Sequence, residues 1–350
     1  MPKRASWREY DTGAHRRMLL GRRLAPTLRL VHEPSPLDRF RRFTVFFLAY
    51  TVGVILWGAW VRVSLSGDGC GESWPLCQGS LVPPDLETKT YVELAHRITS
   101  ALTGFFAIAA VVWSRRLAPP GSLLRRSAMA SLLFVVFEGL VGAAQVKLGY
   151  VAENPSEARG YWAALHLANT FFMLFSMTWL VRAAAGVKAP ARLFPKDARL
   201  DWLGLGALVI VAAMGAVTAL GDTVFPASSF AEGLAQELAH DAHLFVRLRV
   251  VHPVLAIATS VFLVARHVPR ALGDEPGRGW DGLLVAVVLG QVVLGIVSVL
   301  LAAPAALQIA HLLLADVLFI AASATLLDRL HRLGEPASAR VDVASEAAAR

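Results

Sequence analysis

The chain has 350 residues, of which 55% are hydrophobic and 17% charged, and its mean hydropathy is +0.53. This composition excludes an ordinary water-soluble domain and indicates a membrane protein. The net charge of +8 comes mainly from the first 42 residues and from short connections between apolar segments, so it indicates membrane topology rather than nucleic-acid binding. Two cysteines are too few for an all-cysteine iron–sulfur or zinc site, so any metal would depend on histidine.

Eight segments are apolar over the length of about 20 residues that crosses a bilayer. They cover residues 43–63, 91–113, 127–148, 160–182, 202–220, 244–265, 281–302 and 305–327. We therefore predict an all-α, polytopic membrane protein with eight transmembrane helices. The remaining parts are a basic N-terminal arm (1–42), a linker (183–201) and a C-terminal tail (328–350).

The charges of the connections predict the orientation of these helices. The arm and the connections 114–126, 183–201 and 266–280 are basic and are expected in the cytoplasm, with both termini. The connections 64–90 and 221–243 are acidic and are expected outside a bacterial inner membrane. Cys70 and Cys77 lie in the first of these outer loops, where a disulfide can persist.

Weak sequence repeats relate the first four segments to the last four. Gly58-Ala59 in the first segment corresponds to Gly215-Ala216 in the fifth, and Glu138, four residues before Gly142, corresponds to Gln291, four before Gly295. The two halves have the same membrane orientation. We expect two four-helix bundles, 43–182 and 202–327, related by a pseudo-twofold axis along the membrane normal.

Each even-numbered segment contains one histidine at a similar predicted depth: His96, His166, His252 and His311. A lone intramembrane histidine is as often a packing residue as a functional one, but four at matched positions indicate a function. Two imidazoles per half suit several metals, including copper and zinc, yet a zinc site would lack ligands. Haem iron needs only two axial protein ligands, so bis-histidine haem fits best.

Charged residues next to the histidines differ between the halves. Glu93 lies three residues before His96 on the same helix face, where it could accept protons or hold a water; the alternative is an interfacial carboxylate exposed to water. Arg97 could pair with a haem propionate or extend to the lipid headgroups. The second half has Arg249 three residues before His252 instead.

The stretch from Gly58 to Gly79, which includes VRVSLSGDGC and WPLC, resembles the heme A synthase signature V-R-x-[ST]-x-S-G, Cys, W-P-x-C and Gly. Glu93-Leu94-Ala95-His96-Arg97 is similar to the E-x-x-H-R sequence that opens that family's second helix. The resemblance covers about residues 43–327. Its outer-loop motif is far more specific than an isolated histidine.

The resemblance implies an oxidoreductase that converts the C8 methyl of haem O to a formyl group and so makes haem A for a terminal oxidase. His96 and His166 would hold the substrate haem, and Glu93 would be essential for catalysis. His252 and His311 would ligate a haem b cofactor. Cys70 and Cys77 match an outer-loop pair that forms a disulfide in the family.

The resemblance also implies partners: a haem O synthase that donates the substrate, and a cytochrome a-type oxidase or its assembly factors that accept the product. Lipid surrounds the chain, nucleic acid is not expected, and a homo-oligomer stays open. Pro253 follows the third histidine where many family members have arginine. Arg247 or Arg249 could then contact the cofactor propionates.

Two other functions compete with this prediction. A membrane cytochrome with two b-type haems could pass electrons between quinol and an outer acceptor, and it would use all four histidines without needing Glu93. A repeat-built transporter would bind no haem. The haem content of the purified protein discriminates among the three.

Overall fold

The computed structural model describes residues 35–273 and 278–334, and all the regular secondary structure in these residues is helical. The predicted all-α fold is confirmed. The elements are α1 (Pro36–Val63), α2 (Thr88–Leu117), α3 (Leu123–Lys147), α4 (Glu157–Ala184), η1 (Lys196–Ala198), α5 (Arg199–Val224), α6 (Phe230–Leu238), α7 (Leu244–Leu248), α8 (Val251–Leu272), α9 (Arg278–Leu300) and α10 (Ala305–Gly334).

Eight helical stretches are long and apolar enough to cross a membrane, as the sequence predicts. Their ends extend beyond the predicted apolar segments, since α1 already begins at Pro36 and α10 continues to Gly334. Proline at the first helical position is favourable because its missing N–H would be unpaired there anyway. The rest of the predicted basic arm and C-terminal tail lies mostly outside the described residues.

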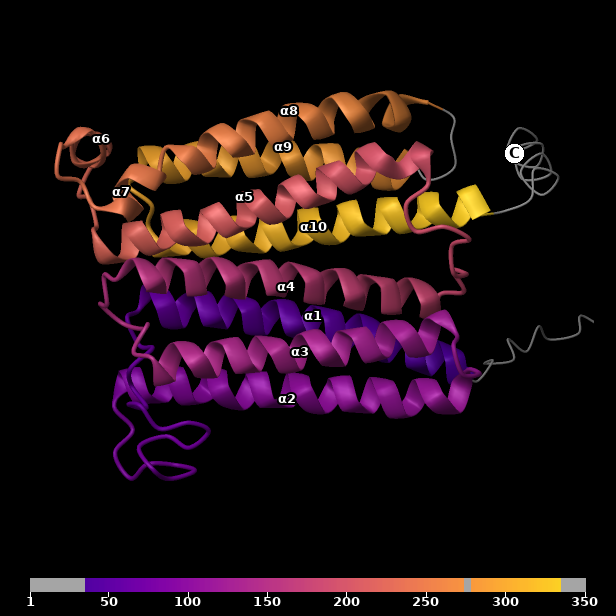
Figure 1. Cartoon of the computed structure of the whole chain (residues 1–350), viewed down its shortest axis with the longest axis horizontal. Coiled ribbons are helices and arrows are strands. Elements are labelled where there is room, and N and C mark those ends of the chain that lie inside the picture. Colours follow the sequence, from indigo (N-terminus) through magenta and orange to yellow (C-terminus); the bar gives the residue numbers. More distant parts are fainter. Residues whose placement is uncertain (1–34, 274–277, 335–350) are drawn as a thin grey trace, which may run out of the picture. The chain divides into compact units, whose positions relative to one another are not determined.

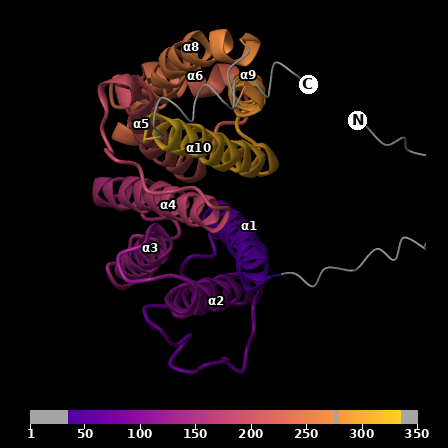
Figure 2. The ribbon, with the colours of Figure 1, turned by 90° about the vertical axis from the view of Figure 1, so that its right-hand side faces the viewer.

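The first four long helices form a closed ring of neighbours, in which α1 packs on α2, α2 on α3, α3 on α4, and α4 on α1. The last four repeat the pattern, with α5 on α8, α8 on α9, α9 on α10, and α10 on α5. Figures 1 and 2 show the two groups. This arrangement is consistent with two four-helix bundles, and the pseudo-twofold relation stays a prediction.

Helices α4 and α10 join the two groups and have the most buried apolar segments of the eight. One side of α4 places Phe171 and Leu174 in a core shared with α5, α9 and α10, whereas Met173 and Met177 pack against α1, α2 and α3. Large apolar side chains such as Phe105 remain exposed on the outer faces of the helices. Such a surface suits a lipid environment.

The two connections predicted to face outward lie at the same end of the helices. The loop between α1 and α2 and the short helices α6 and α7 gather at the left of Figure 1. His96, early in α2, and His252, early in α8, are therefore near this end. Its assignment to the outer face of a membrane stays a prediction.

Candidate functional site

The second group of helices brings together the two histidines predicted to form a pair there. The rings of His252 on α8 and His311 on α10 lie 6.3 Å apart between centroids and are nearly perpendicular, at 82°. Nδ1 of His252 is 3.1 Å from the carbonyl oxygen of Val211 on α5. Nε2 of Gln291 on α9 lies 3.1 Å from Nε2 of His311.

The distance between the two rings fits two imidazoles bound to one haem iron. Two imidazoles on one metal ion, each with a metal–nitrogen bond of about 2 Å, place their ring centroids roughly 6 Å apart. Nδ1 of His311 is buried and has no hydrogen-bond partner among the described residues. A buried ring nitrogen without a partner is costly unless it binds something the protein itself does not supply.

The first group of helices holds the corresponding pair. His96 lies on α2 and His166 on α4, and Nδ1 of each is buried without a hydrogen-bond partner within the described part of the chain. Nδ1 of His166 lies 3.4 Å from Oε1 of Glu138 on α3. Both imidazoles are half-buried, and two histidines on facing helices are the residue types that could hold a haem iron.

Glu138 is bonded mainly to the neighbouring helix. Its Oε2 accepts a hydrogen bond of 2.5 Å from the amide of Asn169, and its Oε1 accepts one from the hydroxyl of Thr170, both on α4. This carboxylate was not among the predicted site residues. Its sequence signals were its place as an acidic residue inside an apolar segment and its spacing from Gly142, which matches that of Gln291 from Gly295.

Glu93 is buried, with only 3% of its surface exposed, one helical turn before His96. Its Oε2 accepts a hydrogen bond of 2.7 Å from the backbone N–H of Cys70. Its Oε1 accepts bonds from Nε and Nη2 of Arg97, at 3.1 and 2.5 Å. The alternative of an interfacial carboxylate exposed to water is therefore wrong for this residue, and the carboxylate contacts the cysteine loop one turn before His96.

The loop above α2 is closed by a disulfide between Cys70 and Cys77. Nη1 of Arg97 donates to the carbonyl oxygens of Ser73 and Leu76, at 2.6 and 2.7 Å. Gly69 packs so closely on the start of α2 that a Cβ there would lie 2.4 Å from the Lys89 carbonyl. The loop is thus fixed to the helix that carries Glu93 and His96.

The two arginines predicted near the haem propionates already have several partners. Arg97 spans Glu93 and the loop, as described above. Nε of Arg249 lies 2.9 Å from Oδ1 of Asp222, and its Nη2 donates to the carbonyl oxygens of Gly221 and Phe225. A propionate contact would require either guanidinium to exchange partners, and both contacts stay predictions.

A buried cluster at the opposite end of the helices was not predicted. The carboxylate of Asp201 on α5 contacts Arg266 and Arg270 on α8 and Arg329 on α10, at 3.2, 2.8 and 3.5 Å. Nearby, Nδ1 of the buried His267 lies 2.6 Å from Asp281. The basic residues of this region were interpreted only as topology signals, because the sequence did not indicate their acidic partner.

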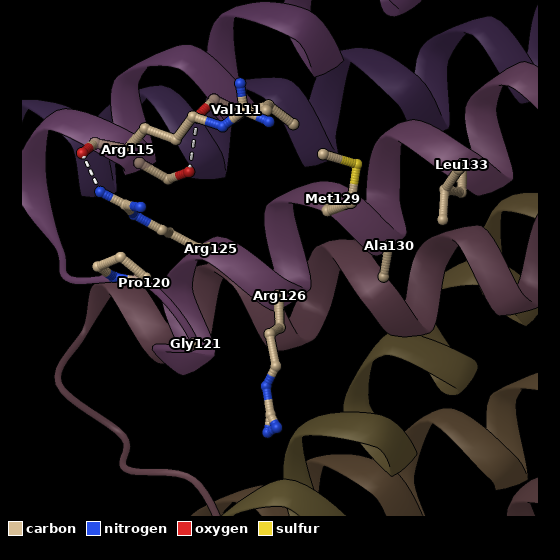
Figure 3. A pocket seen from close by; sticks show the side chains of 10 residues that line it. Val111, Arg115, Pro120, Gly121, Arg125, Arg126, Met129, Ala130 and Leu133 are labelled. Atoms are coloured by element: carbon tan, nitrogen blue, oxygen red, sulfur yellow. Dashed lines mark hydrogen bonds between the residues drawn. The ribbon is translucent and has the colours of Figure 1, made fainter.

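Figure 3 shows a cavity of about 420 Å³ where α2 turns into α3. Arg125 lines it and donates a hydrogen bond to the carbonyl oxygen of Arg115. The cavity contains none of the predicted site residues, and it lies at the end of α2 remote from His96. We therefore place the candidate site at the histidine pairs and the cysteine loop.

Comparison with known families tests the resemblance seen in the motifs. The family model COX15-CtaA, described as cytochrome oxidase assembly protein, matches residues 41–323. The chain belongs to the COX15-CtaA family. The match covers all four histidines, Glu93 and both cysteines, so the predicted family is confirmed.

Several curated relatives resemble this COX15-CtaA chain. Over 286 residues it is 38% identical to a Protoheme IX farnesyltransferase of Thermus thermophilus, an alignment that covers 77% of this chain and 46% of the relative. Over 92 residues it is 49% identical to a Heme A synthase of Symbiobacterium thermophilum, covering 26% and 30% of the two chains. A Heme A synthase of Halalkalibacterium halodurans is 35% identical over 112 residues, or 31% and 38%. The chain spans less than half of the Thermus relative.

Proposed function

We propose that this COX15-CtaA member is a heme A synthase, which oxidises a methyl group of haem O to the formyl group of haem A. The observation that carries the proposal is the buried Glu93, one turn before His96 and hydrogen-bonded to the cysteine loop. A plain electron carrier needs axial imidazoles but no buried carboxylate beside one of them. The similarity to two proteins named Heme A synthase supports the same conclusion.

In this proposal His96 and His166 hold the iron of the substrate haem, and Glu93 handles protons next to it. Residues three apart on a helix share one face, so the carboxylate and the imidazole of His96 face the same space. Arg97 and the N–H of Cys70 orient the carboxylate. The disulfide-closed loop covers this part of α2 and limits the access of bulk water.

The reaction requires water as the oxygen source. Each hydroxylation joins a water oxygen to the methyl carbon and releases two protons and two electrons, and the electrons go in the end to an external electron carrier. A second hydroxylation gives a gem-diol, which loses water to leave the aldehyde. Glu93 accepts the released protons, a usual role for a positioned carboxylate.

His252 and His311 have the spacing to ligate a second haem, of the b type. When bound there, haem b supplies a one-electron acceptor close to the substrate half. The chain's own contribution is to orient the imidazole of His252 through the Val211 carbonyl. The Gln291 amide lies against Nε2 of His311 and would have to give up this contact for that nitrogen to bind iron.

The proposal includes a cellular setting. The substrate would come from a haem O synthase, a class that the farnesyltransferase name of the Thermus relative suggests. The product would pass to a cytochrome a-type oxidase or to its assembly factors. The chain would reside in a bacterial inner membrane with the cysteine loop outside and both termini in the cytoplasm.

The test is expression together with a protoheme farnesyltransferase, followed by chromatography of the extracted haems. Wild-type protein should accumulate haem A. Glu93→Gln keeps an acceptor for the Cys70 N–H but no longer takes up a proton, so haem O should stay bound while haem A falls by roughly 100-fold or more, within the usual range for an acid–base group.

Glu87→Gln is the matched control, because Glu87 is exposed at the start of the same helix. It should form haem A at the wild-type level. Normal haem A formation by Glu93→Gln would refute the role of this carboxylate. Haem B alone in the wild-type protein would instead support the di-haem cytochrome.

A further inference from the structure

The same packing feature recurs at all four intramembrane histidines. The Cε1 edge of each imidazole faces a glycine on the preceding long helix of its own group. The four pairs, in chain order, are Gly58 with His96, Gly142 with His166, Gly215 with His252, and Gly295 with His311. A Cβ built on each glycine in turn would lie 3.0, 3.8, 3.0 and 3.2 Å from that carbon.

We infer that three of these glycines, Gly58, Gly215 and Gly295, are positioning residues for the imidazoles that they contact closely. The missing side chain lets each ring approach the neighbouring helix and so fixes the plane of the ring and the direction of its ligating nitrogen. This inference rests on the proposed binding of haem by the histidines, and it adds residues that touch the ligands rather than the iron.

The positions of the glycines are specific. Glycine is disfavoured within helices, so its placement against all four rings has to be explained by packing. At Gly53 on α1, Gly139 on α3 and Gly206 on α5, an added methyl group would have no neighbouring atom of the described residues within 4 Å. On α1 and α3 the glycines thus divide into those that contact a histidine and those with open space around them, whereas Gly204 and Gly221 on α5 and Gly290 on α9 contact other residues of neighbouring helices.

Gly215 shows how such a contact orients a ring. The carbonyl oxygen of Val211 lies one turn before Gly215 on α5, and it is 3.1 Å from Nδ1 of His252. A side chain at Gly215 would stand next to this carbonyl and displace the ring. The bond places the ring proton on Nδ1 and leaves Nε2 free to bind iron, which is how outer partners usually orient metal-binding histidines.

The distances predict an order of effects for substitution by alanine. Carbon atoms in ordinary contact lie about 3.5–4.0 Å apart. Alanine at Gly58 or Gly215 therefore forces the imidazole to move, alanine at Gly295 forces a smaller movement, and alanine at Gly142 is accommodated.

The experiment is a haemin titration of the full-length protein in detergent, followed by electron paramagnetic resonance of the ferric complex. The g values of a bis-imidazole haem report the relative orientation of the two rings, which a purely structural role of the glycine would leave unchanged. The Gly58 and Gly142 variants are made in a His311→Ala protein, which lacks one ligand of the second pair. The Gly215 and Gly295 variants are made in a His166→Ala protein, which lacks one ligand of the first pair. Gly53→Ala and Gly206→Ala are the matched controls on the same helices.

We expect Gly58→Ala and Gly215→Ala to shift the g values of their own pair and to weaken haemin binding roughly 10- to 100-fold, as is usual when the orientation of a metal ligand is disturbed. Gly53→Ala, Gly206→Ala and Gly142→Ala should have the same g values and the same haemin affinity as their parent proteins. Unchanged g values and affinity in both Gly58→Ala and Gly215→Ala would overturn the inference. Failure of the glycine-intact protein to bind haemin would overturn the proposed function itself.

Discussion

The Glu93 carboxylate binds the cysteine loop and also lies one helical turn from the proposed haem ligand His96. It receives hydrogen bonds from the loop at Cys70 and from the guanidinium of Arg97, so it is buried with partners rather than alone. These three hydrogen bonds leave about one of the four lone-pair sites of the carboxylate for a proton. The dual position explains why Gln rather than Ala is the informative replacement.

Glu138 provides a prediction about the packing of α3 against α4. Replacing it with Ala removes one of the two acceptors of the Asn169 amide and of the Thr170 hydroxyl, which keep the carbonyl oxygens of Phe134 and His166. Each lost hydrogen bond contributes about 0.5–1.5 kcal/mol. Glu138→Ala should therefore lower the thermal unfolding midpoint clearly, and Glu138→Gln should lower it less.

Leu140→Ala is a suitable control on α3, because Leu140 is 57% exposed on the outer surface of the helices. Its midpoint should stay close to that of the wild type. An unfolding midpoint of Glu138→Ala that equals the control would show that the carboxylate contributes nothing to this packing.

At the scale of elements, the number and order of the long helices could be predicted because each needs only a continuous apolar stretch. The ends could not be located as well. Helix α1 begins at Pro36 and α10 extends to Gly334, since the polar turns beyond the hydrocarbon region have no hydropathy signal. The partners of buried charges were also missed, because they depend on which helix faces lie together.

The cluster around Asp201 is the clearest example of buried charges whose partners the sequence did not reveal. One carboxylate on α5, with 4% of its side chain exposed, contacts arginines of α8 and α10. Removing one member of a buried ionic group costs about 3–5 kcal/mol, because the remaining charges stay buried without compensation. Asp201→Asn should strongly lower the unfolding midpoint in detergent.

Asp197→Asn is the corresponding control, since Asp197 is exposed in the 3₁₀ turn just before α5. Its midpoint should be unchanged. If Asp201→Asn also unfolded at the wild-type temperature, the cluster would have no role in joining α5 to α8 and α10.

At the scale of the whole molecule, the two groups of helices meet through α4 and α10, and polar side chains such as Arg62 also link them. Nη1 of Arg62, at the end of α1, donates to Thr223 on α5, and its Nη2 donates to Gln308 on α10, at 2.6 and 3.0 Å. Arg62 belongs to the motif that indicated the family, but the motif did not show that it bridges the groups. Its partners lie far away in sequence, and only the packed structure brings them together.

The residues of the candidate site could be predicted from the sequence about as well as the helices. Residue type and depth in the membrane identified the four histidines, and spacing placed Glu93 beside His96. The sequence repeats include the four glycines and Glu138, but the contacts of these residues depend on how neighbouring helices rotate against each other. The assignment of one haem to each half therefore stays a prediction that needs a direct measurement.

That measurement is the number and identity of haems in the wild-type protein and in His96→Ala and His252→Ala, determined by pyridine haemochrome spectra and chromatography. Each helix group should hold its own haem, so His252→Ala should lose haem B and keep haem O, while His96→Ala should lose haem O and haem A and keep haem B. Variants that both lose the same haem, or a wild-type protein with a single haem, would contradict the account.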